Sequence, residues 1–137
     1  MKEKEHIVLD TNVLLMCIHP QSQYRKVWQA FLNEKYVLCV SNDILEEYSE
    51  VIARNINVKV ADYILQVILL HENVKFYDPH FRFNLIKDDE DDNKFVDCAF
   101  AANAKCIVTE DHHFNILNKI DFPHIEVIGI DLFCQTL

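Results

Sequence analysis

The alternation of short apolar runs with longer helical patterns constrains the fold of this chain more than any other feature of its sequence. Strands are predicted at residues 7–9, 36–40, 74–76, 106–109 and 126–128. Helices are predicted at about residues 24–34, 42–55, 58–71, 91–104 and 111–118. Strands that alternate with helical patterns are typical of βα units, whose strands pair in parallel while helices cover both faces of the sheet. The pattern therefore predicts a three-layer α/β domain with a mainly parallel sheet.

A single domain is expected over residues 1–137. The chain shows no repeat, linker or low-complexity tract, and half of its residues are hydrophobic, which is enough for one packed core. It contains one glycine, Gly129. Phosphate-binding loops and dinucleotide-binding turns need several glycines to bring backbone N–H groups close to phosphate. Both classes of nucleotide-binding protein are therefore excluded.

The chain is acidic, with 13 basic and 22 acidic side chains and a formal net charge of −9. A protein that holds nucleic acid by neutralising phosphates is usually basic. A role on nucleic acid would therefore require metal ions or a local basic patch. The basic residues best able to hold phosphates are Arg25, Lys26, Arg54, Lys59, Arg82 and Lys87.

The sequence predicts a cytoplasmic protein that does not enter a membrane. Its five cysteines lie far apart, without a C-x-x-C pair, as is typical of reduced thiols. The N-terminal residues carry no apolar run of the kind found in signal peptides. No segment approaches the roughly 20 uninterrupted apolar residues of a membrane helix.

Two of the predicted strands run into a carboxylate. Asp10 directly follows the apolar residues 7–9, and Asp111 comes shortly after the strand that begins at Cys106. A carboxylate in so apolar a segment is expensive to desolvate, but it is tolerated at the carboxyl end of a parallel strand. This end is also where α/β sheets bind ligands. The alternative interpretation is that each acid caps the helix after it.

Two further carboxylates come from predicted helices. In the helix at 42–55, Glu47 lies at the border of the apolar stripe, where it can reach the edge of the sheet. In the acidic run 88–92, Asp92 projects onto the buried face of the helix that follows, whereas Asp91 falls at the edge of that face and remains an alternative. An inward carboxylate at a helix N-terminus is stabilised by the free N–H groups there.

These four acids are predicted to converge on one edge of the sheet. Carboxylates a few Å apart raise one another's pKa and stay ionised only beside a cation. Oxygen ligands without a supporting set of histidines and cysteines favour Mg²⁺ or Mn²⁺ over zinc. The chemistry that best uses such a site is metal-assisted phosphodiester hydrolysis, in which the metal binds the phosphate and lowers the pKa of the attacking water.

A resemblance to a known family is carried by four segments: IVLDTNVLL, VSNDILEEYSEVI, DDEDDNKFVDCAFAANAKCIVTEDHHF and IEVIGIDLF. In order and spacing they resemble the PIN-domain ribonucleases, above all the bacterial PIN proteins described as toxin components of toxin–antitoxin systems. The resemblance covers essentially the whole chain. It implies a twisted parallel sheet flanked by helices, often assembled as a homodimer. It also implies endonucleolytic cleavage of single-stranded RNA and an antitoxin protein as partner.

The resemblance also implies roles for the four acids that match the family's motif: Asp10, Glu47, Asp92 and Asp111. Asp10 and Asp92 would be the principal ligands of Mg²⁺ or Mn²⁺. Asp111 would help to hold the metal, and Glu47 would orient the attacking water. Three polar residues at strand ends would shape the site through hydrogen bonds: Thr11, Asn12 and Ser41.

Two other functions stay open at this stage. Phosphatases with an aspartate at the end of the first strand need a second aspartate two residues later as general acid, where this chain has Asn12. An inactive PIN-like module would bind RNA or a protein without a carboxylate-dependent Mn²⁺ site. His112 and His113, which follow Asp111, are interpreted as exposed polar residues.

Overall fold

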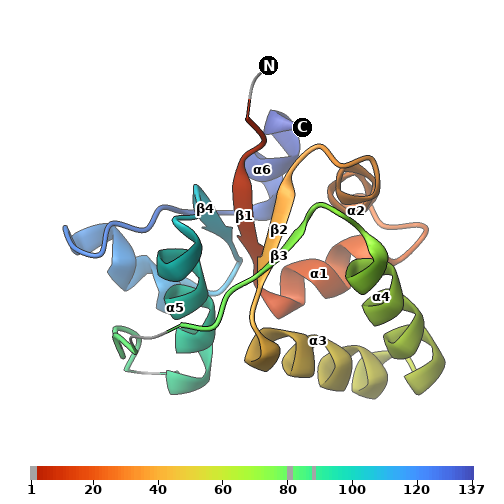
Figure 1. The fold of residues 1–137 in the computed structure, drawn as a ribbon, viewed down its shortest axis with the longest axis horizontal. Helices are drawn as coiled ribbons and strands as arrows, with labels where there is room; N and C mark the ends of the chain where they lie inside the picture. The colour runs from red at the N-terminus through yellow and green to blue at the C-terminus, as the bar shows by residue number, and fades with distance from the viewer. Residues whose placement is uncertain (1–2, 80–81, 88) are drawn as a thin grey trace.

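The centre of the molecule is a parallel sheet, seen in a computed structural model that describes residues 3–79, 82–87 and 89–137. The described residues form five strands in the order β3-β2-β1-β4-β5, and each neighbouring pair is parallel. Figure 1 shows β4 on one side of β1, with β2 and β3 on the other. The strands are β1 (His6–Leu9), β2 (Val37–Val40), β3 (Val74–Phe76), β4 (Cys106–Val108) and β5 (Val127–Ile128). The predicted α/β class and parallel sheet are confirmed.

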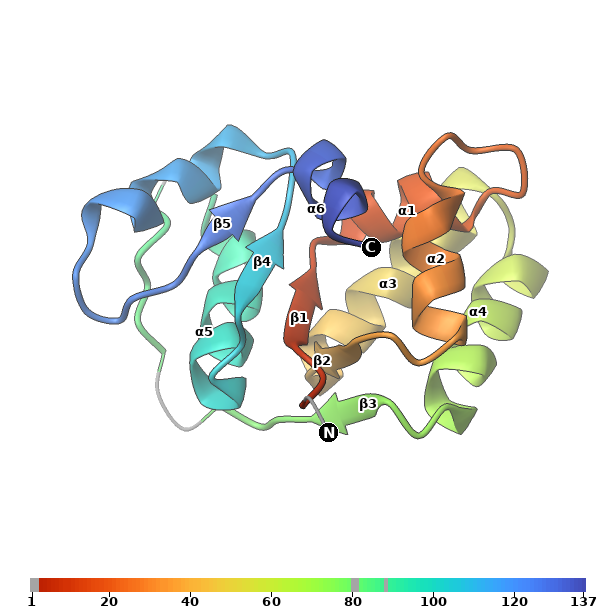
Figure 2. The ribbon, with the colours of Figure 1, turned by 90° about the horizontal axis from the view of Figure 1, so that it is seen from above.

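Helices cover both faces of this sheet and give it three layers. On one face, α5 (Asn93–Ala102) packs against β1, β2 and β4. On the other side of β1 lie α1 (Thr11–Ile18), α2 (Arg25–Leu32), α3 (Asn42–Asn55) and α4 (Val58–Leu70) (Figure 2). The remaining helices are η1 (Glu90–Asp92), η2 (His112–Lys119) and α6 (Ile130–Thr136). None of the described helices has the length and apolar character that crossing a membrane demands.

The core explains why β1 is the central strand. Ile7, Val8 and Leu9 are each at most 1% exposed, because β2 and β4 flank the strand and helices cover both of its faces. Strands buried on both faces have continuous apolar sequences rather than alternating ones. Each such side chain contributes roughly 1.5–3 kcal/mol by its burial. A central, buried strand thus delivers Asp10 to the edge of the sheet.

The sequence pattern missed α1 and α6 and misjudged two short helices. Five of the eight residues of α1 are buried, so the helix is apolar on most sides and shows no stripe of helical periodicity. α6 has seven residues, too few to show one. The predicted helix at 111–118 is a 3₁₀ helix, η2, and the helix at 91–104 begins as one, η1. The other predicted boundaries differ from the observed ones by at most two residues, as is usual for element ends.

The strand order creates a switch point between β1 and β4. From β1 the chain moves outward through β2 to β3, and α5 then returns it to β4 on the other side of β1. In open α/β sheets, ligands bind beyond the carboxyl ends of the strands at such a point. Because Asp10 follows β1 and Asp111 comes shortly after β4, both lie at the switch point.

Candidate active site

Asp10 is a buried carboxylate at the end of β1. Leu9 pairs with Val108 in the sheet, which places Asp10 beside Thr109, and the Thr109 hydroxyl donates a 2.7 Å hydrogen bond to Oδ2 of Asp10. Burial raises the pKa of Asp10 to about 6 although the hydrogen bonds from Thr109 and the Thr11 backbone lower it. Asp10 stands at the N-cap position of α1, but its side chain makes no capping hydrogen bond.

Asp92 lies at the end of η1 and is 9% exposed. Its Oδ2 is buried and has no hydrogen-bond partner in the described part of the chain. Burial raises the pKa of Asp92 to about 8, with further contributions from a hydrogen bond with Asp111 and from the charges of Asp10, Asp89 and Asp111. A carboxyl group in this environment either binds a proton at neutral pH or is balanced by a cation.

Asp111 lines the same hollow as Asp10 and Asp92, and it is linked to Asp10 through Thr109. Its backbone N–H donates a 3.0 Å hydrogen bond to the Thr109 hydroxyl, and its Oδ1 accepts a 2.9 Å hydrogen bond from the His113 N–H at the start of η2. Burial alone would raise the pKa of Asp111. The hydrogen bonds from the His113 backbone and Asp92, with the nearby histidines, hold it below its usual value. Thr109 therefore fixes the spacing of the two strand-end acids, a role that sequence reasoning missed.

Four residues form what we term the aspartate–histidine cluster: Asp89, Asp92, Asp111 and His113. Each offers one ligand atom, and the four atoms lie within 4.8 Å of one another. This spacing suits one metal ion, because metal–ligand bonds of roughly 2.0–2.6 Å bring ligand atoms to such separations. The unpartnered oxygen of Asp92 fits the same conclusion. Asp10 lies beside the cluster, where its charge raises the pKa of Asp92.

Two members of the aspartate–histidine cluster, Asp89 and His113, were not predicted as site residues. Asp89 belongs to the acidic run 88–92, of which the sequence analysis singled out Asp91 and Asp92 alone, and Asp88 lies outside the described residues. The sequence does not distinguish Asp89 from its neighbours, since the course of the preceding loop decides where it points. His113 carried a weak signal, because it follows Asp111 by two residues in the first turn of η2.

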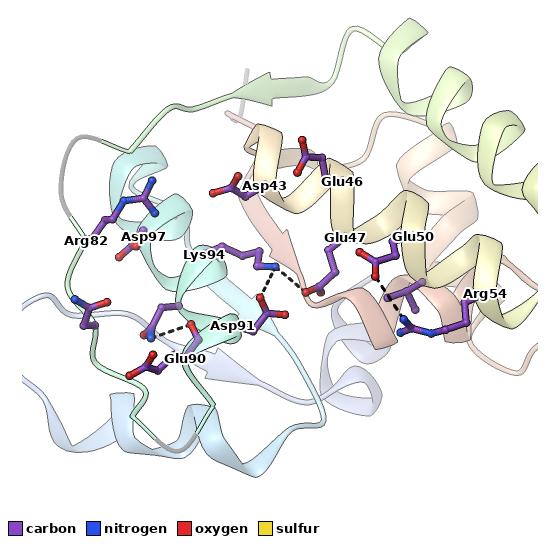
Figure 3. A pocket seen from close by; sticks show the side chains of 13 residues that line it. Asp43, Glu46, Glu47, Glu50, Arg54, Arg82, Glu90, Asp91, Lys94 and Asp97 are labelled. Carbon is purple, nitrogen blue, oxygen red and sulfur yellow. Dashed lines mark hydrogen bonds and ion pairs between the residues drawn. The ribbon is translucent and has the colours of Figure 1, made fainter.

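Glu47 lies next to the aspartate–histidine cluster but is held by other partners. Its Oε1 is 2.8 Å from Nζ of Lys94, and its Oε2 accepts a hydrogen bond from the Thr11 hydroxyl. Lys94 points between Glu47 and Asp91 (Figure 3). Partial burial would lower the pKa of Lys94, but hydrogen bonds to both acids outweigh that effect and raise it. Sequence reasoning did not anticipate Lys94, because its position depends on the packing of α5 against α3.

The structure separates the two alternatives Asp91 and Asp92. The side chain of Asp91 is 73% exposed and forms a 3.1 Å ion pair with Lys94. A hydrogen bond with Glu47 and the contact with Lys94 lower the pKa of Asp91. Asp92 turns inward, as its position on the helix predicted, and it joins Asp111 in the aspartate–histidine cluster.

The three predicted site-shaping residues lie in different places. Thr11 is buried and holds Glu47, while Asn12 is exposed and lines the same hollow as Asp10. Ser41 lies at the N-cap of α3, where its hydroxyl accepts a 3.3 Å hydrogen bond from the Ile44 N–H. Ser41 thus acts on the start of the helix that carries Glu47, and it lines a separate hollow.

Two hollows meet at Glu47, Val51 and Arg54, which line both of them. The first, of about 410 Å³, contains Asp10, Asn12, Asp89, Asp92 and Asp111. The second, of about 490 Å³, contains Arg82 and Lys94 among several carboxylates (Figure 3). An open groove therefore leads from the buried acids past Lys94. Of the basic residues proposed from sequence, Arg54 and Arg82 line it.

Comparisons with known proteins agree with this architecture. The sequence pattern of the PIN domain family matches residues 6–113. An uncharacterized protein of Methanocaldococcus jannaschii, MJ1680, is 31% identical over 140 residues, which cover 92% of this chain and 87% of that protein. The chain therefore belongs to the PIN domain family.

A solved structure has a similar fold. It is the crystal structure of VapBC2 from Rickettsia felis bound to a DNA fragment from their promoter. The match has a TM-score of 0.61 at 15% sequence identity and covers 90% of this chain and 98% of the other. At this identity the likeness concerns the fold alone, and it confirms the predicted PIN-like arrangement.

Proposed function

We propose that this PIN domain is a metal-dependent endoribonuclease that hydrolyses phosphodiester bonds in single-stranded RNA. The observation that carries the proposal is the unpartnered, buried oxygen of Asp92 among further acids at the switch point of the sheet. In a protein that binds no cation such an arrangement would only lower stability, because unpaired buried charge destabilises the folded state. A site that binds a divalent cation gains from it.

The residues of the chain divide the work of this site. Asp10, Asp92 and Asp111 are the proposed ligands of Mg²⁺ or Mn²⁺, and Thr109 holds two of these acids in place through its hydroxyl. Glu47, fixed by Thr11 and Lys94, is placed to orient the attacking water. A bound divalent ion supplies charge neutralisation at the scissile phosphate and lowers the pKa of water.

The acidic groove also fits this requirement for metal. The net charge of −9 repels a polyanion, and carboxylates outnumber the basic side chains along the groove. Phosphate neutralisation by the protein alone therefore does not account for RNA binding. Arg54, Arg82 and Lys94 are the cations that line this groove, and Arg54 also lines the hollow that contains the acids, so these three are the proposed contacts of an RNA strand.

We also propose that the protein is a cytoplasmic toxin of a toxin–antitoxin pair, that it forms a homodimer, and that a protein antitoxin restrains it. The resemblance of its sequence motifs to PIN-domain toxins supports this assignment, and the likeness in fold to a chain of VapBC2 agrees with it. Light scattering after size-exclusion chromatography tests the dimer, which has twice the mass of one chain.

Cleavage of a mixed-sequence single-stranded RNA tests the enzymatic proposal. The assay compares Mn²⁺, Mg²⁺ and EDTA for the wild type, for Asp10→Asn and for the control Asp62→Asn, which changes an exposed acid on α4. We expect Asp10→Asn to lower the cleavage rate by on the order of 10³-fold. The variant removes a proposed metal ligand, and a bound metal ion stabilises the transition state by several kcal/mol. EDTA should abolish cleavage by the wild type and by Asp62→Asn. Full metal-dependent cleavage by Asp10→Asn contradicts the proposal.

A further inference from the structure

The aspartate–histidine cluster contains a nitrogen ligand in a site that the sequence predicted to consist of carboxylates alone. His113 and three aspartates place one ligand atom each within 4.8 Å of one another. Oδ2 of Asp92 is closed off from solvent without a hydrogen-bond partner in the described part of the chain, and Nδ1 of His113 is also closed off and lies beside the carboxylate of Asp111. The Asp92 oxygen therefore has free coordinating capacity close to an imidazole nitrogen.

The fold holds the His113 ring at this position. The backbone N–H of His113 donates to Oδ1 of Asp111 at 2.9 Å, which fixes the first turn of η2 against the carboxylate. The ring nitrogen Nδ1 then lies 3.0 Å from the same oxygen. The preceding residue, His112, stacks on His113 with 4.3 Å between ring centroids, but its own side chain is 82% exposed. One histidine of the pair faces the acids, and the other faces solvent.

An imidazole changes which metal such a site prefers. Mg²⁺ favours oxygen ligands and retains several waters, so a histidine contributes little to its binding. Imidazole suits the later first-row transition metals, and affinity for mixed nitrogen and oxygen sites rises from Mn²⁺ through Fe²⁺ and Co²⁺ to Ni²⁺. A set of three carboxylates and one imidazole therefore discriminates against Mg²⁺.

Building on the proposed function, we propose that Asp89 and His113 complete the metal site with Asp92 and Asp111, and that His113 makes the site prefer a first-row transition metal ion over Mg²⁺. Asp89 approaches from the residue before η1, and His113 approaches from the start of η2. These two segments thus bring their ligand atoms to within 4.8 Å of a carboxylate oxygen of Asp92.

A different role for His113 predicts an effect of the opposite sign. If its ring acts only as a counter-charge for Asp111, it competes with a metal ion for the carboxylates. Removing the ring then strengthens metal binding. If the ring is a ligand, removing it weakens the binding of Co²⁺ far more than the binding of Mg²⁺.

The experiment measures metal binding by the full chain after removal of all metal. Calorimetric titrations with Co²⁺ and with Mg²⁺ compare the wild type, His113→Ala, His113→Gln, Asp89→Asn and the control His112→Ala, and the visible spectrum of bound Co²⁺ is recorded for each. We expect His113→Ala and His113→Gln to weaken Co²⁺ binding at least tenfold and Mg²⁺ binding less than threefold, with an altered Co²⁺ spectrum. Asp89→Asn should weaken both ions, and His112→Ala should match the wild type.

Three results overturn the inference: unchanged Co²⁺ binding by both His113 variants, equal loss of Co²⁺ and Mg²⁺ affinity, or tighter binding. Should the variants fail to fold, the imidazole ¹⁵N resonances of the wild type decide, since added Zn²⁺ must shift those of His113. The proposed function is tested separately by Asp92→Asn. If His113 has no effect while Asp92→Asn loses all metal, the nuclease site stands and the inference fails. If the wild type binds neither ion, both fail.

Discussion

Asp91 and Asp92 are neighbours in the sequence, yet the structure places them in opposite electrostatic environments. Asp91 is exposed and paired with Lys94, and its pKa is lowered. Asp92 is buried, keeps an oxygen without a partner, and its pKa is raised to about 8. Burial is the largest cause of the raised pKa of Asp92, whereas Glu47 and Lys94 lower the pKa of Asp91. Lys94 forms no ion pair with Asp92 in the described part of the chain. Lys94 thus balances the charges of Asp91 and Glu47, whereas Asp92 has no such basic partner among the described residues.

The largest effect on RNA cleavage is expected when Asp92 or Asp91 is replaced by asparagine, one residue at a time. Asp92→Asn should lower metal-dependent RNA cleavage by on the order of 10³-fold, because it removes the proposed ligand from the buried side of the site. Asp91→Asn should keep cleavage within about threefold of the wild type, which corresponds to less than about 1 kcal/mol. Initial rates on the same RNA at saturating Mn²⁺ measure both. Equal losses of cleavage activity in the two variants would contradict the proposal that Asp92 binds the metal ion and Asp91 does not.

The next effect is a loss of stability when the ion pair between Lys94 and Glu47 is removed. Lys94→Ala leaves Glu47 without its cation at a position where both side chains are 16% exposed. The free energy of unfolding should fall by about 1–3 kcal/mol, as expected for an uncompensated polar group that is largely buried. The matched control is Arg54→Ala, whose ion pair with Glu50 is mostly exposed. It should change stability by less than about 0.5 kcal/mol in urea denaturation.

A third prediction concerns how the stability of the metal-free protein depends on pH through Asp91 and Asp92. The raised pKa of Asp92 means that the folded state retains a proton that the unfolded state has released. Stability should therefore fall as the pH rises from about 4 to about 8, by on the order of 1 kcal/mol or more. Asp92→Asn should remove the part of this decline above about pH 6, while Asp10, whose pKa is raised to about 6, still contributes below it. The lowered pKa of Asp91 has the opposite sign, so its contribution is present above pH 4 and lost in acid. Thermal melts in EDTA at several pH values measure both slopes.

A smaller effect is expected at Thr109. Thr109→Val keeps the shape of the side chain but removes the hydroxyl that donates to Asp10 and accepts from the Asp111 N–H. The pKa of Asp10 should rise further, and Mn²⁺ affinity should fall several-fold, in line with about 0.5–1.5 kcal/mol for a hydrogen bond. Thr136→Val, at the C-terminal end of α6, serves as the control. Wild-type Mn²⁺ affinity in Thr109→Val would remove Thr109 from the account.

Much of this fold could be predicted from the sequence because its strands are short, apolar and separated by amphipathic helices. Asp10 and Asp111 were predicted to lie together because both follow predicted strands, and parallel strands end at the same edge of a sheet. Helix periodicity correctly turned Asp92 inward, whereas it left Asp91 at the edge of the buried face, and the structure shows Asp91 exposed. Periodicity failed for α1, which is buried on most sides and therefore shows no polar face.

The residues that sequence reasoning missed depend on contacts between distant segments. Lys94 meets Glu47 across 47 positions of the sequence, and Thr109 meets Asp10 across 99. Asp89 and His113 reach the aspartate–histidine cluster through the course of a loop and the first turn of a 3₁₀ helix. Apart from the weak signal that His113 gives by following Asp111, local spacing does not contain this information, because these contacts are set by how α3, α5 and η2 pack around the end of β1.

The role of the buried Asp92 oxygen as a metal ligand is tested by calorimetric titration of Mn²⁺ into the wild type, Asp92→Asn and Asp91→Asn. We expect the wild type and Asp91→Asn to bind Mn²⁺ with similar affinity and Asp92→Asn to show no binding. All three proteins should be folded, since asparagine keeps the shape of aspartate at both positions. Mn²⁺ binding by Asp92→Asn as tight as that of the wild type would contradict the account, because the unpartnered oxygen would then have no part in the site.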